Sequence, residues 1–193
     1  GVAAACATSE PESEPRGADA GPVGPGPDAD GAGWPDADAD SVDAAPAWDP
    51  SELPEAPLPR FPLGVASGDA DATSVVLWTR YAGGDSLRAL WWRDGEPAGA
   101  ADAPGVDGFV HVTVDALEPG ARYEYAFVEL AGGAPVARSP IGRFRAAPGP
   151  DDMPALVFGA SACTFNAFDR YRTLEHAGLR SDLDAYFHLG DTS

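Results

Sequence analysis

Polar and apolar residues alternate with a period of two through the middle of the chain. The clearest case is residues 109–114, where three valines alternate with phenylalanine, histidine and threonine. Such alternation predicts a strand with one buried and one exposed face. Further short runs of this kind, separated by turn residues, occur at residues 73–80, 87–93, 123–130 and 142–145. Residues 61–147 are therefore predicted to form an all-β domain.

The pattern changes near the end of the chain. Residues 156–160 and 185–189 are short apolar runs, and apolar residues recur at helical spacing between Asn166, a candidate N-cap, and Gly178, a candidate C-cap. Two buried strands joined by a helix predict a βαβ unit with parallel strands. Parallel strands end at one edge of the sheet, and open α/β folds bind ligands at that edge. The residues that follow the two strands are therefore candidate site residues.

The first 57 residues show neither pattern. They consist mainly of Ala, Asp, Gly, Pro, Glu and Ser, with Asp-Ala repeats at 36–40. Their few apolar side chains cannot offset an ordering cost of about 1–2 kcal/mol per residue, so we expect a disordered, extended tail. A second break, Pro-Gly-Pro, occurs at 148–150. These breaks divide the chain into a tail (1–57), a β domain (58–148) and the start of an α/β domain (153–193).

Acidic residues dominate the charge, but unevenly. The chain carries 31 acids and 12 bases, a net charge of −19, and every base is arginine. Residues 1–57 hold 13 acids and one base, which leaves 18 acids and 11 arginines for the rest. The acidity is therefore mainly a property of the tail. The sequence has no basic stripe that could neutralise phosphates, so we do not expect nucleic acid as a partner.

The first residues suggest a membrane anchor. Small residues run into Cys6, and this resembles the end of a bacterial lipoprotein signal, in which the cysteine is lipidated. On this interpretation the protein is exported, Cys6 is its only link to a membrane, and the acidic tail is a spacer. The alternative is an alanine-rich segment with an incidental cysteine. No apolar run reaches the roughly 18–20 residues that a membrane span needs.

Cys163 and Asp191 follow the two predicted strands of the βαβ unit. A helix N-terminus or a nearby metal favours the thiolate form of a cysteine, and a carboxylate after a buried strand is costly unless it is paired or coordinated. The pair therefore predicts part of a metal site, with capping or an ion pair as the alternative role for Asp191. His188 faces the opposite way from Asp191 on a strand, which favours a core or supporting position.

A turn in the β domain resembles a known corner motif. Leu117, Pro119, Gly120 and Tyr123 have the spacing of the tyrosine corner of fibronectin type III sandwiches, in which the Tyr hydroxyl binds backbone upstream of its strand. The resemblance implies that the β domain is a fibronectin type III-like sandwich. This domain gathers no catalytic residue types, so a structural role is favoured over a binding module.

Several motifs, in order, resemble PhoD-like alkaline phosphatases and phosphodiesterases. Residues 61–69 read Phe-Pro-Leu-Gly-Val-Ala-Ser-Gly-Asp, and residues 75–80 read Val-Val-Leu-Trp-Thr-Arg. The Pro-Gly-x-x-Tyr-x-Tyr stretch and the exit Ile-Gly-Arg-Phe-Arg-Ala-Ala-Pro, residues 141–148, follow. The family's metallophosphatase domain then has a strand ending in Ser-Cys and a strand ending in His-Leu-Gly-Asp. The resemblance implies a sandwich followed by the truncated start of an α/β metallophosphatase domain.

The family implies a phosphoric ester hydrolase with a centre of iron and calcium. Its cysteine and its Gly-Asp aspartate are metal ligands, which carries over to Cys163 and Asp191. A thiolate suits iron, and a carboxylate can bridge to a hard cation. An alanine separates Ser161 from Cys163, and Thr192-Ser193 replaces the usual aromatic–aliphatic pair, so the match is imperfect. With two ligands at most, this chain alone is expected to be inactive.

Two alternatives remain at the level of sequence. One is a surface lipoprotein whose sandwich binds a partner. The other is a purple acid phosphatase-like enzyme, which also carries a sandwich and a Gly-Asp motif but has an aspartate where this chain has Cys163. The sequence does not separate monoesters from diesters or phospholipids as substrates.

Overall fold

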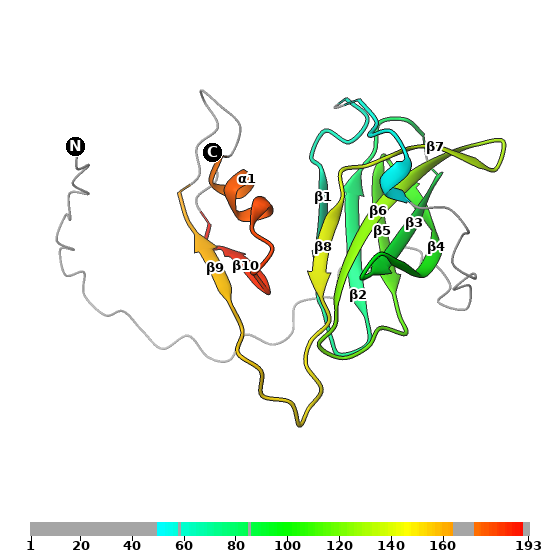
Figure 1. The fold of residues 1–193 in the computed structure, drawn as a ribbon. Coiled ribbons are helices and arrows are strands. Elements are labelled where there is room, and N and C mark those ends of the chain that lie inside the picture. The colour runs from blue at the N-terminus through cyan, green and yellow to red at the C-terminus, as the bar shows by residue number, and fades with distance from the viewer. Residues whose placement is uncertain (1–49, 58, 85, 164–171, 191–193) are drawn as a thin grey trace, which may run out of the picture. The chain divides into compact units, whose positions relative to one another are not determined.

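The computed structural model describes residues 50–57, 59–84, 86–163 and 172–190 (Figure 1). The predicted lipidation site Cys6 and the predicted disordered tail up to residue 49 lie outside the described residues. So do the candidate N-cap Asn166 and the candidate ligand Asp191. Among the helices that the structure describes, none is long and apolar enough to cross a membrane.

Eight strands form a sandwich of two connected sheets (Figure 1). One layer contains β1, β2 and β5, and the other contains β3, β6, β7 and β8. The fourth strand, β4, pairs with β3 along most of its length and with β5 through its last two residues, so it belongs to both layers. The strands span β1 Val65–Gly68, β2 Val75–Arg80, β3 Ser86–Arg93, β4 Glu96–Val106, β5 Phe109–Val114, β6 Arg122–Ala131, β7 Ala134–Arg138 and β8 Gly142–Arg145. The predicted all-β sandwich is confirmed.

The core lies between the two layers and follows the alternation in the sequence. On β5, Val110, Val112 and Val114 are buried while His111 and Thr113 are exposed. On β6, five consecutive buried positions end with Glu129. Burial of such apolar side chains is the main favourable contribution to folding.

Three strands, β1, β4 and β7, are absent from the sequence-based expectation. The residues of β4 read as a loop because they are mostly Ala, Gly, Pro and acids. Packing explains this composition: Ala100 and Ala103 are fully buried, and a Cβ at Gly99 would lie 2.2 Å from the ring of Trp91. The side-chain volume that fills the core beside β4 comes from Trp91 of β3 and not from the residues of β4.

Residues upstream of the predicted boundary at residue 58 contact the sandwich. A 3₁₀ turn, η1, spans Pro50–Glu52. Ala56 donates its N–H to the carbonyl of Arg138 at 2.8 Å, and Arg138 also forms an ion pair with Glu55 at 3.2 Å. Leu53 packs against buried residues of the β3 layer. The packed part of the chain therefore includes this segment, which pairs along the edge strand β7.

The tyrosine corner is confirmed. The backbone N–H of Glu118 donates to the hydroxyl oxygen of Tyr123 at 2.9 Å. Tyr123 is buried, and its ring stacks on Phe144 with centroids 5.1 Å apart. This contact fixes the chain where it enters β6.

The last part of the chain forms the expected strand–helix–strand unit, with β9 Phe158–Ser161, α1 Arg172–Leu179 and β10 Ala185–His188. The strands pair in parallel, as predicted. Two details differ. The strands were expected to be buried, but Phe158 and Phe187 are 58% and 52% exposed, because no described element covers those side chains. Gly178, expected to cap the helix, lies inside α1, which continues to Leu179.

Replacement of Tyr123 by Phe should destabilise the sandwich by about 1–3 kcal/mol, because the N–H of Glu118 loses its acceptor. Urea unfolding monitored by tryptophan fluorescence measures this change. Tyr186→Phe is the matched control, since the structure shows no hydrogen-bond partner for that hydroxyl among the described residues. Equal midpoints for the two variants would contradict the prediction.

Candidate metal centre

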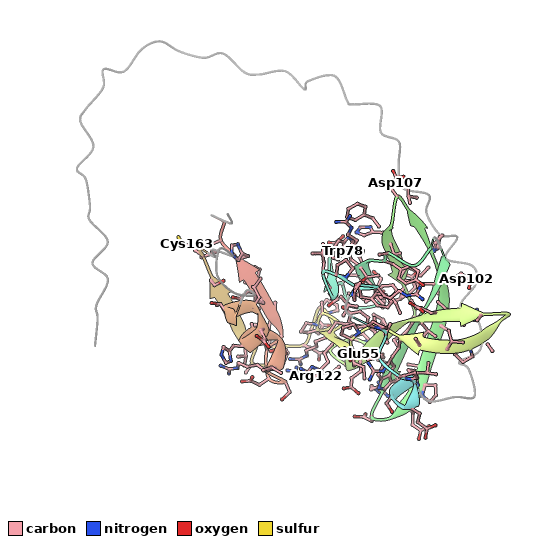
Figure 2. All side chains as sticks on the ribbon, turned by 90° about the horizontal axis from the view of Figure 1, so that it is seen from above. Glu55, Trp78, Asp102, Asp107, Arg122 and Cys163 are labelled. Carbon is pink, nitrogen blue, oxygen red and sulfur yellow. The ribbon has the colours of Figure 1, made fainter. Side chains whose placement is uncertain are left out.

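The carboxyl ends of β9 and β10 meet at one edge, as the sequence predicts for a parallel pair. Ser161 is the register partner of His188 at the end of the ladder. Beyond it, the N–H of Leu189 donates to the carbonyl of Ser161 at 2.7 Å, and the N–H of Cys163 donates to the carbonyl of Gly190 at 3.1 Å. The backbone of Cys163 therefore lies beside the residue that precedes Asp191. Figure 2 labels Cys163 just beyond the end of β9.

Cys163 has an unusual backbone conformation. Its φ is 55°, in the left-handed region, and its side chain is exposed. Residues other than Gly, Asn and Asp rarely adopt this conformation, which costs on the order of 1–3 kcal/mol and is enriched at functional sites. The turn thus presents an exposed thiol at the strand edge in a conformation that local sequence preference does not explain.

Two further polar groups lie at the same edge. His188 is half-buried, and its Nδ1 accepts the N–H of Gly190 at 3.2 Å. The hydroxyl oxygen of Ser161 is buried and has no hydrogen-bond partner among the described residues. In the described ranges, no three His, Cys, Asp or Glu side chains gather as a metal site. Cys163 is therefore placed at the expected edge, while Asp191 lies outside the described residues and its predicted role stays a prediction.

A charged cluster lies at the opposite ends of these strands, and the sequence analysis gave its members no role. The side chain of Asp184 is only 5% exposed. Its Oδ2 accepts the N–H of Val157 at 2.7 Å, and its Oδ1 accepts from Arg145 at 2.9 Å and from Arg122. Burial opposes ionisation of this carboxyl, but the Val157 hydrogen bond and the two arginines outweigh it and hold the pKa of Asp184 below its ordinary value.

The sequence carries a signal for this cluster. Arg143 and Arg145 flank the buried Phe144 on β8, so the two-residue period places both arginines on the outer side of the strand. The sequence analysis used this Gly-Arg-x-Arg stretch only as part of a family motif. Its acidic partner is nearly 40 residues away along the chain, and no local pattern links the two.

The pKa of Asp184 should lie below 3.8 in the folded protein and should rise when Arg145 is replaced by Met, because burial is then less opposed. Its ionisation therefore stabilises the fold above the ordinary pKa, and this contribution is lost as the pH falls through the lowered value. Carbon-detected NMR titration of the carboxyl groups measures the shift. Asp182, whose carboxylate is hydrogen-bonded to Arg180, is the internal control and should not change. An unaltered Asp184 midpoint in the variant would contradict the assignment.

Comparison with solved structures gives fibronectin type III domains at low overall similarity. The domain from human KIAA0970 protein is 15% identical, covers 51% of this chain and 80% of that chain, and has a TM-score of 0.41. The domain of human fibronectin type III domain containing protein 3 is 16% identical, covers 59% and 99%, and has a TM-score of 0.33. The sandwich assignment rests on the strand order described above.

Comparison with protein families and curated sequences is more specific. Residues 47–148 match the N-terminal domain of PhoD-like phosphatases. Alkaline phosphatase D of Bacillus subtilis (strain 168) is 35% identical over 152 residues, which cover 68% of this chain and 24% of that protein. The chain thus spans about a quarter of that relative. It belongs to the PhoD-like phosphatase family, of which it carries the N-terminal domain.

Proposed function

We propose that the protein is an exported, metal-dependent hydrolase of phosphate monoesters or diesters, and that Cys163 and Asp191 are two of its metal ligands. One observation carries the proposal: the exposed thiol of Cys163 lies at the carboxyl edge of a parallel strand pair, beside Gly190, in a left-handed turn. Membership of the PhoD-like phosphatase family supports the reaction class. The β9–α1–β10 unit is, on this proposal, the start of an α/β metallophosphatase domain.

The donor set suits the metals that the family resemblance implies, iron with calcium. Thiolates select softer transition metals, and carboxylates suit hard cations. Cys163 would hold the first metal, and Asp191 would hold or bridge to the second. Bound metals would supply an activated hydroxide and neutralise charge on the phosphoryl group. The unpartnered hydroxyl of Ser161 at this edge is consistent with a polar ligand that the described residues do not provide.

In the full-length protein, replacement of Cys163 by Ala should remove iron and lower the rate of phosphate ester hydrolysis by at least a hundredfold. Metal analysis and hydrolysis of chromogenic monoester and diester substrates measure the two effects. Cys6→Ala is the matched control, because it removes the other thiol of the sequence from a segment far upstream of the strand edge. Full activity and metal content in the Cys163 variant would refute the proposal.

We infer, as a separate point, that Cys6 is lipidated and that residues 7–49 connect a membrane anchor to the sandwich. The support is the run of small residues before Cys6 and the acidic, proline-rich composition after it. This anchor is the only membrane contact in the proposal.

Expression in a bacterium with lipoprotein processing should therefore give a protein that partitions into the detergent phase and incorporates radiolabelled palmitate. Cys6→Ser should move it to the aqueous phase, while Cys163→Ser should not, because only the first cysteine can receive the lipid. Aqueous partitioning of the wild-type protein would refute the anchor without affecting the metal proposal.

A further inference from the structure

Three arginines of the sandwich bind residues of β9–α1–β10. The sandwich and this strand–helix–strand segment belong to the same compact part of the chain. Arg122, on β6, donates to the carbonyls of Ser181 and Leu183 and to the carboxylate of Asp184. On β8, Arg145 donates to the same carboxylate at 2.9 Å. Arg143 donates to the carbonyl of Gly178 at 2.7 Å. All three bind within one segment, the end of α1 and the turn that leads into β10.

The ion pair between Arg145 and Asp184 is formed by two largely buried side chains, one of which is held in place by a second hydrogen bond. Arg145 is 16% exposed, and its Nε donates to the carbonyl of Gly120 at 2.9 Å, so the sandwich orients the guanidinium before it meets the carboxylate. Asp184 is 5% exposed. A charge at such a position is costly unless it is paired, so loss of Arg145 leaves the Asp184 carboxylate with less compensation, from Arg122 and the N–H of Val157 alone. Exposed ion pairs on protein surfaces carry no such penalty.

Asp184 also determines how the two strands begin. It immediately precedes β10, and Val157 immediately precedes β9. Two hydrogen bonds join these residues: Val157 N–H to the Asp184 carboxylate at 2.7 Å, and Asp184 N–H to the Val157 carbonyl at 2.8 Å. The parallel ladder that starts here ends with Ser161 opposite His188. A slip by one residue would exchange the faces of every side chain along it.

Arg143 adds a restraint on the helix. It binds the carbonyl of Gly178 near the end of α1, where carbonyl groups lack partners within the helix. A cation at this end is also favoured by the helix dipole. The helix, the turn and the first residue before β10 are thus all fixed from the same side, by β6 and β8.

We propose that Arg122, Arg143 and Arg145 form an interdomain lock on Asp184 and the end of α1, which sets the register of β9 and β10 and so positions the edge that carries Cys163. Asp184 and Arg145 are positioning residues, since they lie at the far ends of the strands from Cys163. The value of this register for metal binding rests on the proposed function, whereas the lock itself does not.

Amide hydrogen exchange followed by NMR tests the lock without metal or substrate. In Arg145→Met and in Asp184→Asn, the amides of Leu189 and Cys163 should exchange at least tenfold faster than in the wild type. The amide of Ser139, which donates to a sandwich carbonyl at 2.8 Å, should keep its rate. Arg145→Lys, which retains a donor, should restore part of the protection.

Two matched controls separate the lock from general loss of charge. Arg93→Met removes a sandwich arginine whose partner, Glu118, belongs to the same domain. Asp182→Asn removes an exposed carboxylate that forms an ion pair with Arg180. Neither variant should change exchange at the strand edge.

Unchanged edge amides in the two lock variants, or equal acceleration in the controls or at Ser139, would overturn the proposal. The lock variants should also be non-additive when combined, because both remove one interaction. Failure of the lock would leave the metal and hydrolysis experiments unaffected, and failure of those would leave the exchange result standing.

Discussion

The carboxylate of Asp184 is the interaction on which the placement of the candidate site depends. It accepts hydrogen bonds from the N–H of Val157, just before β9, and from two arginines of the sandwich, and its side chain is almost fully buried. Desolvation of the Asp184 carboxylate makes this arrangement sensitive to loss of a partner, since the side chain is only 5% exposed and water cannot fully replace a lost donor. On the proposed lock, the sandwich thereby contributes to the geometry of the neighbouring strand edge.

The fold was predictable where a single strand carries its own burial pattern. Residues 109–114 and 75–80 alternate because each strand has one face on the core, and both were found as strands. β4 was missed because its small residues fit beneath Trp91, and this complementarity is a property of two strands together. The parallel pairing of β9 and β10 followed from connection rules, which hold irrespective of the residues involved.

The candidate site was predictable to the level of its edge. The backbone of Cys163 lies against that of Gly190, as two parallel strands require. The supporting residues escaped the sequence analysis because Arg122 and Asp184 are distant along the chain and meet only through the tertiary fold. In the sequence, Asp184 looks like any exposed acidic residue. Only the structure shows that its side chain is buried and paired with arginines.

The left-handed backbone at Cys163 restricts which ligands this turn can offer. The described residues that share this conformation without being glycine include Asp69, Asp94 and Asp107, in keeping with the tolerance of aspartate for it. An aspartate could therefore replace the thiol without a new backbone penalty, whereas a β-branched side chain could not. The turn thus permits exchange between a soft and a hard donor by a single substitution, so on the proposed function the metal preference of this edge would change while its architecture is retained.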